Sequence, residues 1–411
     1  LKQIGANLDV LTRTGSATSI SLLIDSDVKR ADLFIAVATS EEINITASIL
    51  SKKLGAKKTI ARIDNQEYLF PKYRDHFTSL GIDYMIYPEM LASKEVVGLL
   101  QQTGTTNIAD FSGGKLSLFS VKLDEDAPII NKSIIETTQG IDYQNYRVVA
   151  ITRNGETIIP RGEDKFLAGD MLYIVSNQAG IPGLMEFSGK KKFDIHNIMI
   201  LGGSRIGMLT SKEMGSQHNV KLIELDREKS YRLSNLLNNT LVINGDGRDM
   251  NLLIEEGIKN MDAFISVTGD SETNILSCVL AKNMGVKKTI AEVENMDYIT
   301  LAENMGIDTI INKKLVTAGR IFHFTASETV TSIKYLTGTD AEVLEFIVKE
   351  DSKITRGALN QIDFPKGSII GGVIRDKSSF IANGYTLIKP DDRVVVFALP
   401  SAINKVGKFF N

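Results

Sequence analysis

The chain has 411 residues, 43% of them hydrophobic and 24% charged, with a formal net charge of −3 and a pI near 6.0. This length favours roughly two to four domains, and the charge disfavours a nucleic-acid-binding protein, which needs a concentrated basic face. No apolar run reaches the ~18–20 residues that a membrane helix requires, so we expect no direct membrane insertion and a cytoplasmic location.

Residues 1–104 alternate apolar and amphipathic segments. The segment LKQIGANLDV resembles the end of a helix that leads into a strand, and the strands ADLFIAV (31–37) and KKTIARI (57–63) follow. Alternating strands and helices predict a parallel sheet with helices on both faces, and we read the two lysines as a solvated strand entrance. Arg62 ends the second strand, where it either holds a ligand phosphate or pairs with Asp64.

Residues 105–190 have a different pattern, with the strands KLSLFSVKL, YRVVAITRNGETIIP and DMLYIVS. The polar turn RNGE predicts a hairpin, and the turn LAGD precedes the last strand. This segment is therefore predicted to be a small α+β domain with antiparallel strands.

Residues 191–329 begin a complete Rossmann pattern. The strand NIMIL enters the turn Gly202-Gly203-Ser204-Arg205-Ile206-Gly207, an amphipathic stretch follows, and the strand VKLIEL carries Glu224 about 20 residues on. Such glycines allow a tight turn and close helix packing, the helix N-terminus attracts a pyrophosphate, and the acid binds a ribose. Serine stands where the middle glycine belongs, so the unit either binds a nucleotide or is a Rossmann shell without a ligand.

The second Rossmann segment repeats the first. Residues 31–68 and 261–298 align without gaps at 17 of 38 positions, including KKTIA at 57–61 and 287–291. Aligned in this way, the first copy lacks the opening strand, glycine turn, helix and second strand, so we expect it to be truncated by about one βαβ unit. Glu292 replaces Arg62 at the end of the KKTIA strand, and the two copies should prefer different ligands.

Residues 330–411 repeat the antiparallel pattern, with VLEFIVKE, GSIIGGVIRDKSSFIAN and DRVVVFALP. Four domains are thus predicted, with boundaries at 1–104, 105–190, 191–329 and 330–411. The apolar helices near 91–103 and 315–327 are predicted either at subunit contacts or in the core. Cys278 is expected to be a small buried residue, and the four scattered histidines lack metal-ligand spacing.

As a set, these segments resemble the TrkA family, the regulatory subunits of bacterial Trk potassium uptake systems, built of two RCK (regulator of potassium conductance) units. The segments that show this resemblance are ADLFIAVATSEEINI with KKTIARI in the first copy, and ILGGSRIG, LIELD, NGDG and FISVTGDSETNI in the second. The resemblance implies NAD(H) or ATP/ADP binding, assembly into a homo-oligomer, expected to be a tetramer, and a TrkH- or TrkG-type membrane channel as partner. It implies no catalysed reaction.

The resemblance also implies site residues. The glycine turn would surround the phosphates, Glu224 would hold the ribose, and Asp246 would lie near the adenine. The implied cofactor-binding set is Gly202, Gly203, Ser204, Arg205, Ile206, Gly207, Glu224, Asp226, Gly245, Asp246, Thr268 and Gly269, with Gly15, Ser16, Thr39 and Arg62 in the first copy. The alternatives are an NAD-dependent oxidoreductase and a regulator of another ion transporter.

Overall fold

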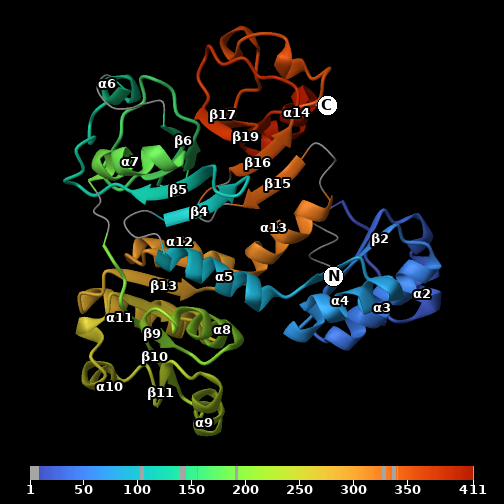
Figure 1. The fold of residues 1–411 in the computed structure, drawn as a ribbon, viewed down its shortest axis with the longest axis vertical. Helices are drawn as coiled ribbons and strands as arrows, with labels where there is room; N and C mark the ends of the chain where they lie inside the picture. Colours follow the sequence, from blue (N-terminus) through green and yellow to red (C-terminus); the bar gives the residue numbers. More distant parts are fainter. Residues whose placement is uncertain are drawn as a thin grey trace. The chain divides into compact units, whose positions relative to one another are not determined.

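The computed structural model describes residues 9–101, 106–138, 145–154, 156–189, 193–325, 330–335, 339 and 341–410. The chain divides into two compact units, Leu1–Leu91 and Ala92–Asn411. Figure 1 shows the elements coloured along the chain. Within the described residues, no helix combines the length and the apolar character that crossing a bilayer demands.

The first unit contains a three-stranded parallel sheet in the order β1-β2-β3. The expected helix end in LKQIGANLDV lies mostly outside the described residues, and residues 11–14 form no strand. The elements are α2 (Ile20–Asp25), β1 (Leu33–Ala36), α3 (Glu41–Leu54), β2 (Lys58–Arg62), α4 (Pro71–Leu80), β3 (Tyr84–Ile86) and α5 (Pro88–Gln101), whose last ten residues belong to the second unit.

The second Rossmann segment contains a six-stranded parallel sheet in the order β11-β10-β9-β12-β13-β14. The chain runs outward from β9 to β11 and then crosses back to β12, which is the doubly wound topology of dinucleotide-binding folds. Its elements are β9 (Asn197–Leu201), α8 (Arg205–Met214), β10 (Asn219–Glu224), α9 (Arg227–Leu236), β11 (Thr240–Asn244), α10 (Met250–Glu255), β12 (Ala263–Ser266), α11 (Ser271–Asn283), β13 (Lys288–Glu292), α12 (Ile299–Asn304), β14 (Thr309–Ile311) and α13 (Lys313–Thr325).

The repeated KKTIA segments form equivalent strands, β2 and β13, in the same register. Thr59 pairs with Phe34 of β1, as Thr289 pairs with Phe264 of β12. An aspartate then accepts the threonine N–H in each copy, Asp83 at 2.7 Å and its counterpart Asp308 at 2.8 Å. The identical segments therefore form the same strand in both copies, and the same threonine–aspartate hydrogen bond holds each strand.

The lysines of the two segments differ, however. Lys57 and Lys287 are exposed, as predicted, and each contacts an aspartate. Lys58 is exposed, but its counterpart Lys288 is only 5% exposed. The prediction of a solvated entrance was therefore wrong for Lys288, because neighbouring groups bury its side chain although the adjacent Lys287 is exposed.

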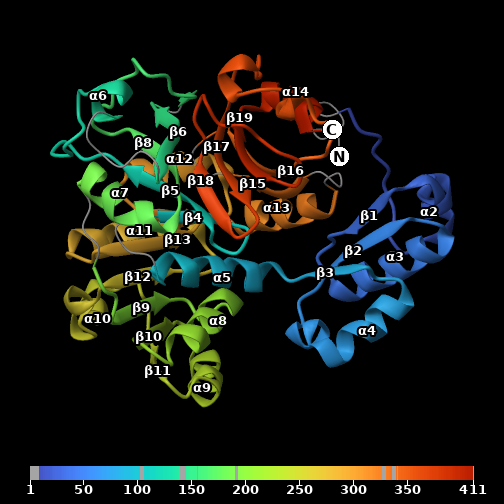
Figure 2. The ribbon, with the colours of Figure 1, turned by 45° about the horizontal axis from the view of Figure 1, so that its top comes forward.

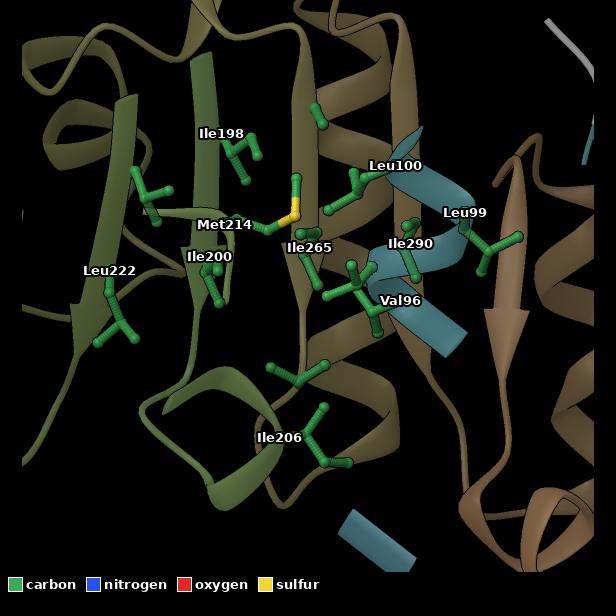
Figure 3. Close-up of a cluster of buried hydrophobic side chains, with 14 of the residues drawn as sticks. Val96, Leu99, Leu100, Ile198, Ile200, Ile206, Met214, Leu222, Ile265 and Ile290 are labelled. Carbon is green, nitrogen blue, oxygen red and sulfur yellow. The ribbon is translucent and has the colours of Figure 1, made fainter. Parts of the chain in front are cut away.

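Helix α5 covers one face of the second sheet. Its apolar residues Val96, Leu99 and Leu100 lie in the same buried cluster as Ile198 and Ile265 of the strands (Figure 3). The core position, one of the two alternatives predicted for this helix, is confirmed, and the subunit contact stays a prediction. A helix that follows the first copy in sequence thus completes the core of the second copy.

Two antiparallel sheets complete the second unit. Their elements are β4 (Thr106–Phe111), β5 (Leu116–Lys122), α6 (Ile134–Thr138), β6 (Tyr146–Arg153), β7 (Glu156–Ile158), β8 (Met171–Ser176) and α7 (Ile181–Ser188), and then β15 (Val330–Tyr335), β16 (Glu342–Ile347), β17 (Ser368–Arg375), β18 (Ser378–Ile381), β19 (Arg393–Ala398) and α14 (Pro400–Phe410). Their orders, β4-β5-β8-β6-β7 and β15-β16-β19-β17-β18, are the same arrangement twice. The two sheets lie side by side (Figure 2). They share an apolar cluster that includes Leu118, Val175, Val395 and Phe397.

Each antiparallel sheet is held by an arginine in its predicted hairpin. Arg153 donates two hydrogen bonds of 2.8 Å to Asp170, and Arg375 donates two of 2.7 Å to Asp392. Both aspartates are 1% exposed. The polar turn and the later acidic turn of each sequence pattern are therefore joined by a bidentate ion pair.

Candidate functional site

The candidate site lies at the carboxyl edge of the second parallel sheet, between β9 and β12. These two strands are hydrogen-bonded neighbours, but the chain leaves them in opposite directions. In open α/β sheets a crevice forms at this switch point, outside the carboxyl ends of the strands. The glycine turn follows β9 here, and Thr268 follows β12.

Two glycines of the turn are required by their surroundings. Gly202 has φ +103°, and a Cβ there would lie 2.9 Å from the main-chain N of Thr268. A Cβ on Gly207 would lie 2.1 Å from the main-chain O of Gly202. The turn is therefore left-handed at Gly202 and packs against the first turn of α8, as the glycine spacing predicted.

Ser204, at the place of the middle glycine, caps helix α8. Its Oγ accepts a hydrogen bond of 3.3 Å from the Gly207 N–H. Arg205 is exposed at the first helical position, while the side chain of Ile206 is buried in the core beneath α5. Serine is compatible with this turn because its hydroxyl satisfies one helix N–H, which leaves other N–H groups of the first turn for an anion.

Glu224 ends β10 beside the glycine turn. Its Oε2 accepts the Gly203 N–H at 2.9 Å, and its Oε1 accepts the Asp226 N–H at 2.9 Å. The ammonium of Lys229 contacts Oε2 at 2.7 Å. Burial by itself raises the pKa of Glu224, but Lys229 and the two N–H groups outweigh it and lower that pKa. The carboxyl group is therefore ionised and fixed against the turn.

Three further predicted residues line the β10–β11 side. Asp226 caps α9 by accepting the Lys229 N–H at 2.7 Å. Gly245 donates its N–H to the Glu224 main-chain O at 3.0 Å. Arg248 binds both oxygens of Asp246, with Nη2 2.7 Å from Oδ2, and this hydrogen bond lowers the Asp246 pKa. Asp246 is thus an anchored carboxylate near the same edge.

Asn274, a residue that sequence reasoning missed, fixes the loop after β12. Its Oδ1 accepts the Thr268 N–H at 2.9 Å and the Thr268 hydroxyl at 2.7 Å. Its Nδ2 donates to the Glu292 main-chain O at 2.8 Å. Gly269 next to Thr268 is exposed. Asn274 and its counterpart Asn44 are identical in the repeat, which is the signal that could have found them.

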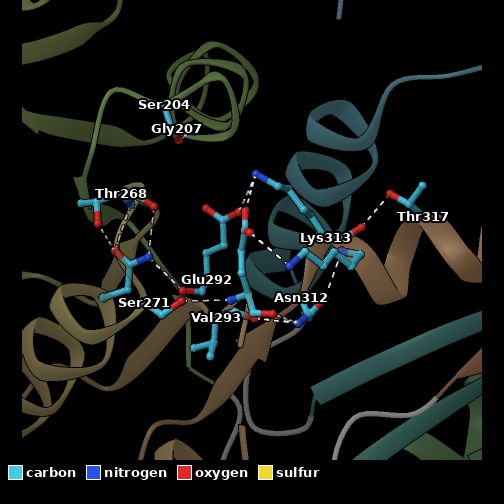
Figure 4. A network of polar contacts seen from close by, with 12 residues as sticks. Ser204, Gly207, Thr268, Ser271, Glu292, Val293, Asn312, Lys313 and Thr317 are labelled. Atoms are coloured by element: carbon cyan, nitrogen blue, oxygen red, sulfur yellow. Dashed lines mark hydrogen bonds and ion pairs between the residues drawn. The ribbon is translucent and has the colours of Figure 1, made fainter. Parts of the chain in front are cut away.

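The far side of the site carries charged groups at the ends of β13 and β14. Figure 4 shows Glu292 on the side of the site opposite Ser204 and Gly207. Lys313 lies at the start of α13. Its Nζ is 3.6 Å from Glu292 Oε1 and 2.7 Å from Glu294 Oε1. Glu292 is 4% exposed, so a buried carboxylate faces the glycine turn.

In the first copy, the structure places Thr39 and Arg62 at the carboxyl ends of β1 and β2. Asn44 there donates to the Arg62 main-chain O at 3.0 Å, as Asn274 does in the second copy. The Arg62 guanidinium lies 3.4 Å from Asp64, so the predicted pairing is present. Gly15 and Ser16 are exposed before α2, and the hydroxyl of Ser16 contacts Thr18 in its own turn.

Two histidines of the second unit lie away from this edge. His196 and His218 directly precede β9 and β10, at the amino ends of the strands. The glycine turn and Glu224 follow the carboxyl ends of the same strands. Among the described residues, no cluster of three His, Cys, Asp or Glu side chains has the geometry of a metal site.

Comparison with known proteins identifies the family. Residues 1–88 and 198–313 match the TrkA-N domain, and residues 118–189 and 343–411 match the TrkA-C domain. The chain belongs to the TrkA family. It is therefore built of tandem RCK units, each a parallel TrkA-N sheet followed by a small antiparallel TrkA-C domain, as the sequence pattern predicted.

Relatives of the TrkA family match along nearly the whole chain. "Trk system potassium uptake protein TrkA homolog 2" of Methanosarcina mazei is 32% identical over 98% of this chain and 91% of the relative. "Trk system potassium uptake protein TrkA" of Vibrio alginolyticus is 30% identical over 97% of this chain and 88% of the relative. This chain is therefore a homologue of regulatory proteins of potassium uptake.

Solved RCK structures have the same fold. The GsuK RCK domain aligns over 100% of this chain and 87% of that chain, with a TM-score of 0.56 and 15% identity. The GsuK channel bound to NAD aligns over 100% of this chain and 72% of that chain, with a TM-score of 0.57 and 16% identity. At this identity the likeness concerns the fold.

Proposed function

We propose that this TrkA-family chain is a non-catalytic regulatory subunit of a potassium transporter, and that its second Rossmann copy binds NAD(H) or an adenine nucleotide such as ATP or ADP. The main support for nucleotide binding is the switch point between β9 and β12, where the glycine turn, the N-terminus of α8 and the ionised Glu224 meet. The relatives named for potassium uptake support the regulatory role.

The parts of such a ligand have separate partners in this proposal. The pyrophosphate lies at the N-terminus of α8, where the helix dipole and free N–H groups favour an anion. The ribose hydroxyls donate to Glu224, and the adenine lies toward Asp246. Thr268 and Gly269 line the side of β12. The buried Glu292 disfavours a terminal phosphate on the far side, whereas Arg62 favours one in the first copy.

A route for the signal begins at α8. The first turn of α8 places Ile206 in the same apolar cluster as Val96 of α5. The hydroxyls of Ser93 on α5 and Thr210 on α8 lie 3.1 Å apart, and both residues are buried. A ligand that binds two positions of α8 with different affinities shifts their populations, and these contacts pass the change on to α5.

The regulated partner is proposed to be a TrkH- or TrkG-type membrane subunit. We propose that the chain is cytoplasmic, that it assembles as a homotetramer, and that it reaches the membrane only through this partner. The support is family membership over the whole chain. Potassium flux into cells that lack the chain, with and without complementation, tests this part directly.

Calorimetric titration of the full chain with NAD⁺, NADH, ATP and ADP tests the ligand. Glu224→Ala should weaken binding roughly ten-fold or more, because a charge-assisted hydrogen bond is worth about 1.5–3 kcal/mol. Glu256→Ala is the matched control, since Glu256 pairs with Lys221 outside the site at 2.9 Å. No binding of any of the four ligands would contradict the proposal, and NAD(H)-dependent turnover would favour an oxidoreductase.

A further inference from the structure

The carboxylate that is proposed to hold the ribose is already occupied. Glu224 Oε2 accepts the Gly203 N–H at 2.9 Å and contacts Lys229 Nζ at 2.7 Å, while Oε1 accepts the Asp226 N–H at 2.9 Å. The side chain is 9% exposed. A carboxylate offers about four lone-pair positions, and three partners use them here. One position is left for a ribose, which presents two neighbouring hydroxyl donors.

The three partners are not equally easy to displace. The N–H groups of Gly203 and Asp226 belong to the turn after β9 and to the N-cap of α9, which the fold holds in place. Lys229 differs, because its side chain is 39% exposed and ends a flexible chain. Its backbone N–H is bound separately by Asp226 Oδ1 at 2.7 Å. The ammonium can therefore leave Glu224 while α9 stays intact.

We propose that Lys229 determines the specificity of the ribose position by competing with the ribose hydroxyls for Glu224 and by offering a cation to a 2′-phosphate. This inference rests on the proposed nucleotide binding. A ribose can donate one hydroxyl to the remaining position of Glu224, but it must displace the ammonium before both hydroxyls bind. A 2′-phosphate would be repelled by Glu224 alone, but Lys229 beside it supplies the opposite charge. The pair therefore narrows the difference in affinity between NAD⁺ and NADP⁺.

Replacement of Lys229 should change the two affinities in opposite directions. In Lys229→Met, NAD⁺ should bind roughly two- to five-fold tighter, the range that the worth of a partly exposed ion pair allows. NADP⁺ should bind more weakly than to the wild type by at least a similar factor. Lys229→Arg keeps the charge and should resemble the wild type. A purely structural role would weaken both ligands together.

Calorimetry of the full chain with NAD⁺ and NADP⁺ provides the test. Lys221→Met is the matched control, because it removes a Lys–Glu pair of 2.9 Å that lies outside the site and involves β10, the strand that carries Glu224. Thermal unfolding checks that every variant folds. Unchanged affinities in Lys229→Met, or a parallel loss for both ligands, would overturn the inference while wild-type NAD⁺ binding upholds the proposed function. If neither the wild type nor Lys229→Met binds NAD⁺ or NADP⁺, the inference fails, and the proposed function fails with it only if NADH, ATP and ADP do not bind either.

Discussion

The side-chain nitrogen of Asn274 donates a hydrogen bond of 2.8 Å to the main-chain oxygen of Glu292, which ties helix α11 to the carboxyl end of β13. The same asparagine holds the loop that carries Thr268. One buried amide thus sets the positions of two strand ends at the candidate site. The first copy repeats this arrangement with Asn44.

Asn274→Ala should therefore affect both stability and binding. It removes the partner of the part-buried Thr268 N–H and of the buried Glu292 main-chain oxygen, and an unsatisfied buried group costs about 1–3 kcal/mol. We expect a lower free energy of unfolding in urea and weaker nucleotide binding. Asn235→Ala is a control, because the exposed Asn235 side chain donates to the Tyr231 main-chain oxygen within α9, away from Thr268 and Glu292. Equal effects of the two substitutions would contradict the assigned role.

Gly207 and Gly269 give a paired test of the glycine turn. A Cβ on Gly207 meets the Gly202 oxygen at 2.1 Å, whereas a Cβ on Gly269 meets no atom within 4 Å. Gly207→Ala should destabilise the protein by about 1–3 kcal/mol, as overpacking does, and weaken nucleotide binding. Gly269→Ala should leave unfolding unchanged. Calorimetry and urea unfolding measure both, and a tolerated Gly207→Ala would show that the turn can relax.

The ion pairs of the TrkA-C domains should be strong stability contacts. Arg153→Met leaves Asp170, which is 1% exposed, without its bidentate partner. Since breaking a buried pair costs about 3–5 kcal/mol and Arg153 is partly exposed, we expect a loss of about 2–4 kcal/mol. Arg30→Met, at an exposed pair with Asp27, is the control and should change the free energy of unfolding little. A small effect at Arg153 would mean that water reaches Asp170.

Lys288 and Lys58 should differ in their effect on stability with pH. Burial lowers the pKa of Lys288 from 10.5 to about 8, although Asp308 opposes this shift. Between these two pH values the unfolded chain binds more protons than the folded chain, so this group makes the protein more stable as pH rises. Below about pH 8 the buried charge costs on the order of 1–3 kcal/mol.

Lys288→Met should therefore be more stable than the wild type at pH 7, and the difference should shrink as pH rises from 8 to 10.5. Lys58→Met is the matched control at the equivalent, exposed position and should show no such convergence. Urea unfolding at several pH values measures this. A constant difference across that range would contradict a titrating, buried Lys288.

The sequence by itself determined the repeat, the alternation of strands and helices, the antiparallel segments and the glycine turn with its acid. These features are local, since the period of apolar residues, a left-handed glycine and an acid at a strand end are set within a few neighbouring residues. The identical Asn44 and Asn274 were also visible, but their bonds to the next strand were not.

Only the tertiary structure decided which side chains meet across the fold. KKTIA occurs twice, yet Lys58 is exposed and Lys288 is buried. Only the structure also showed that Lys229 contacts Glu224 and that α5 packs in the core of the second copy. Burial and charge pairing depend on groups far apart in sequence. Identical residues therefore contribute differently to the free energy of folding when different elements cover them.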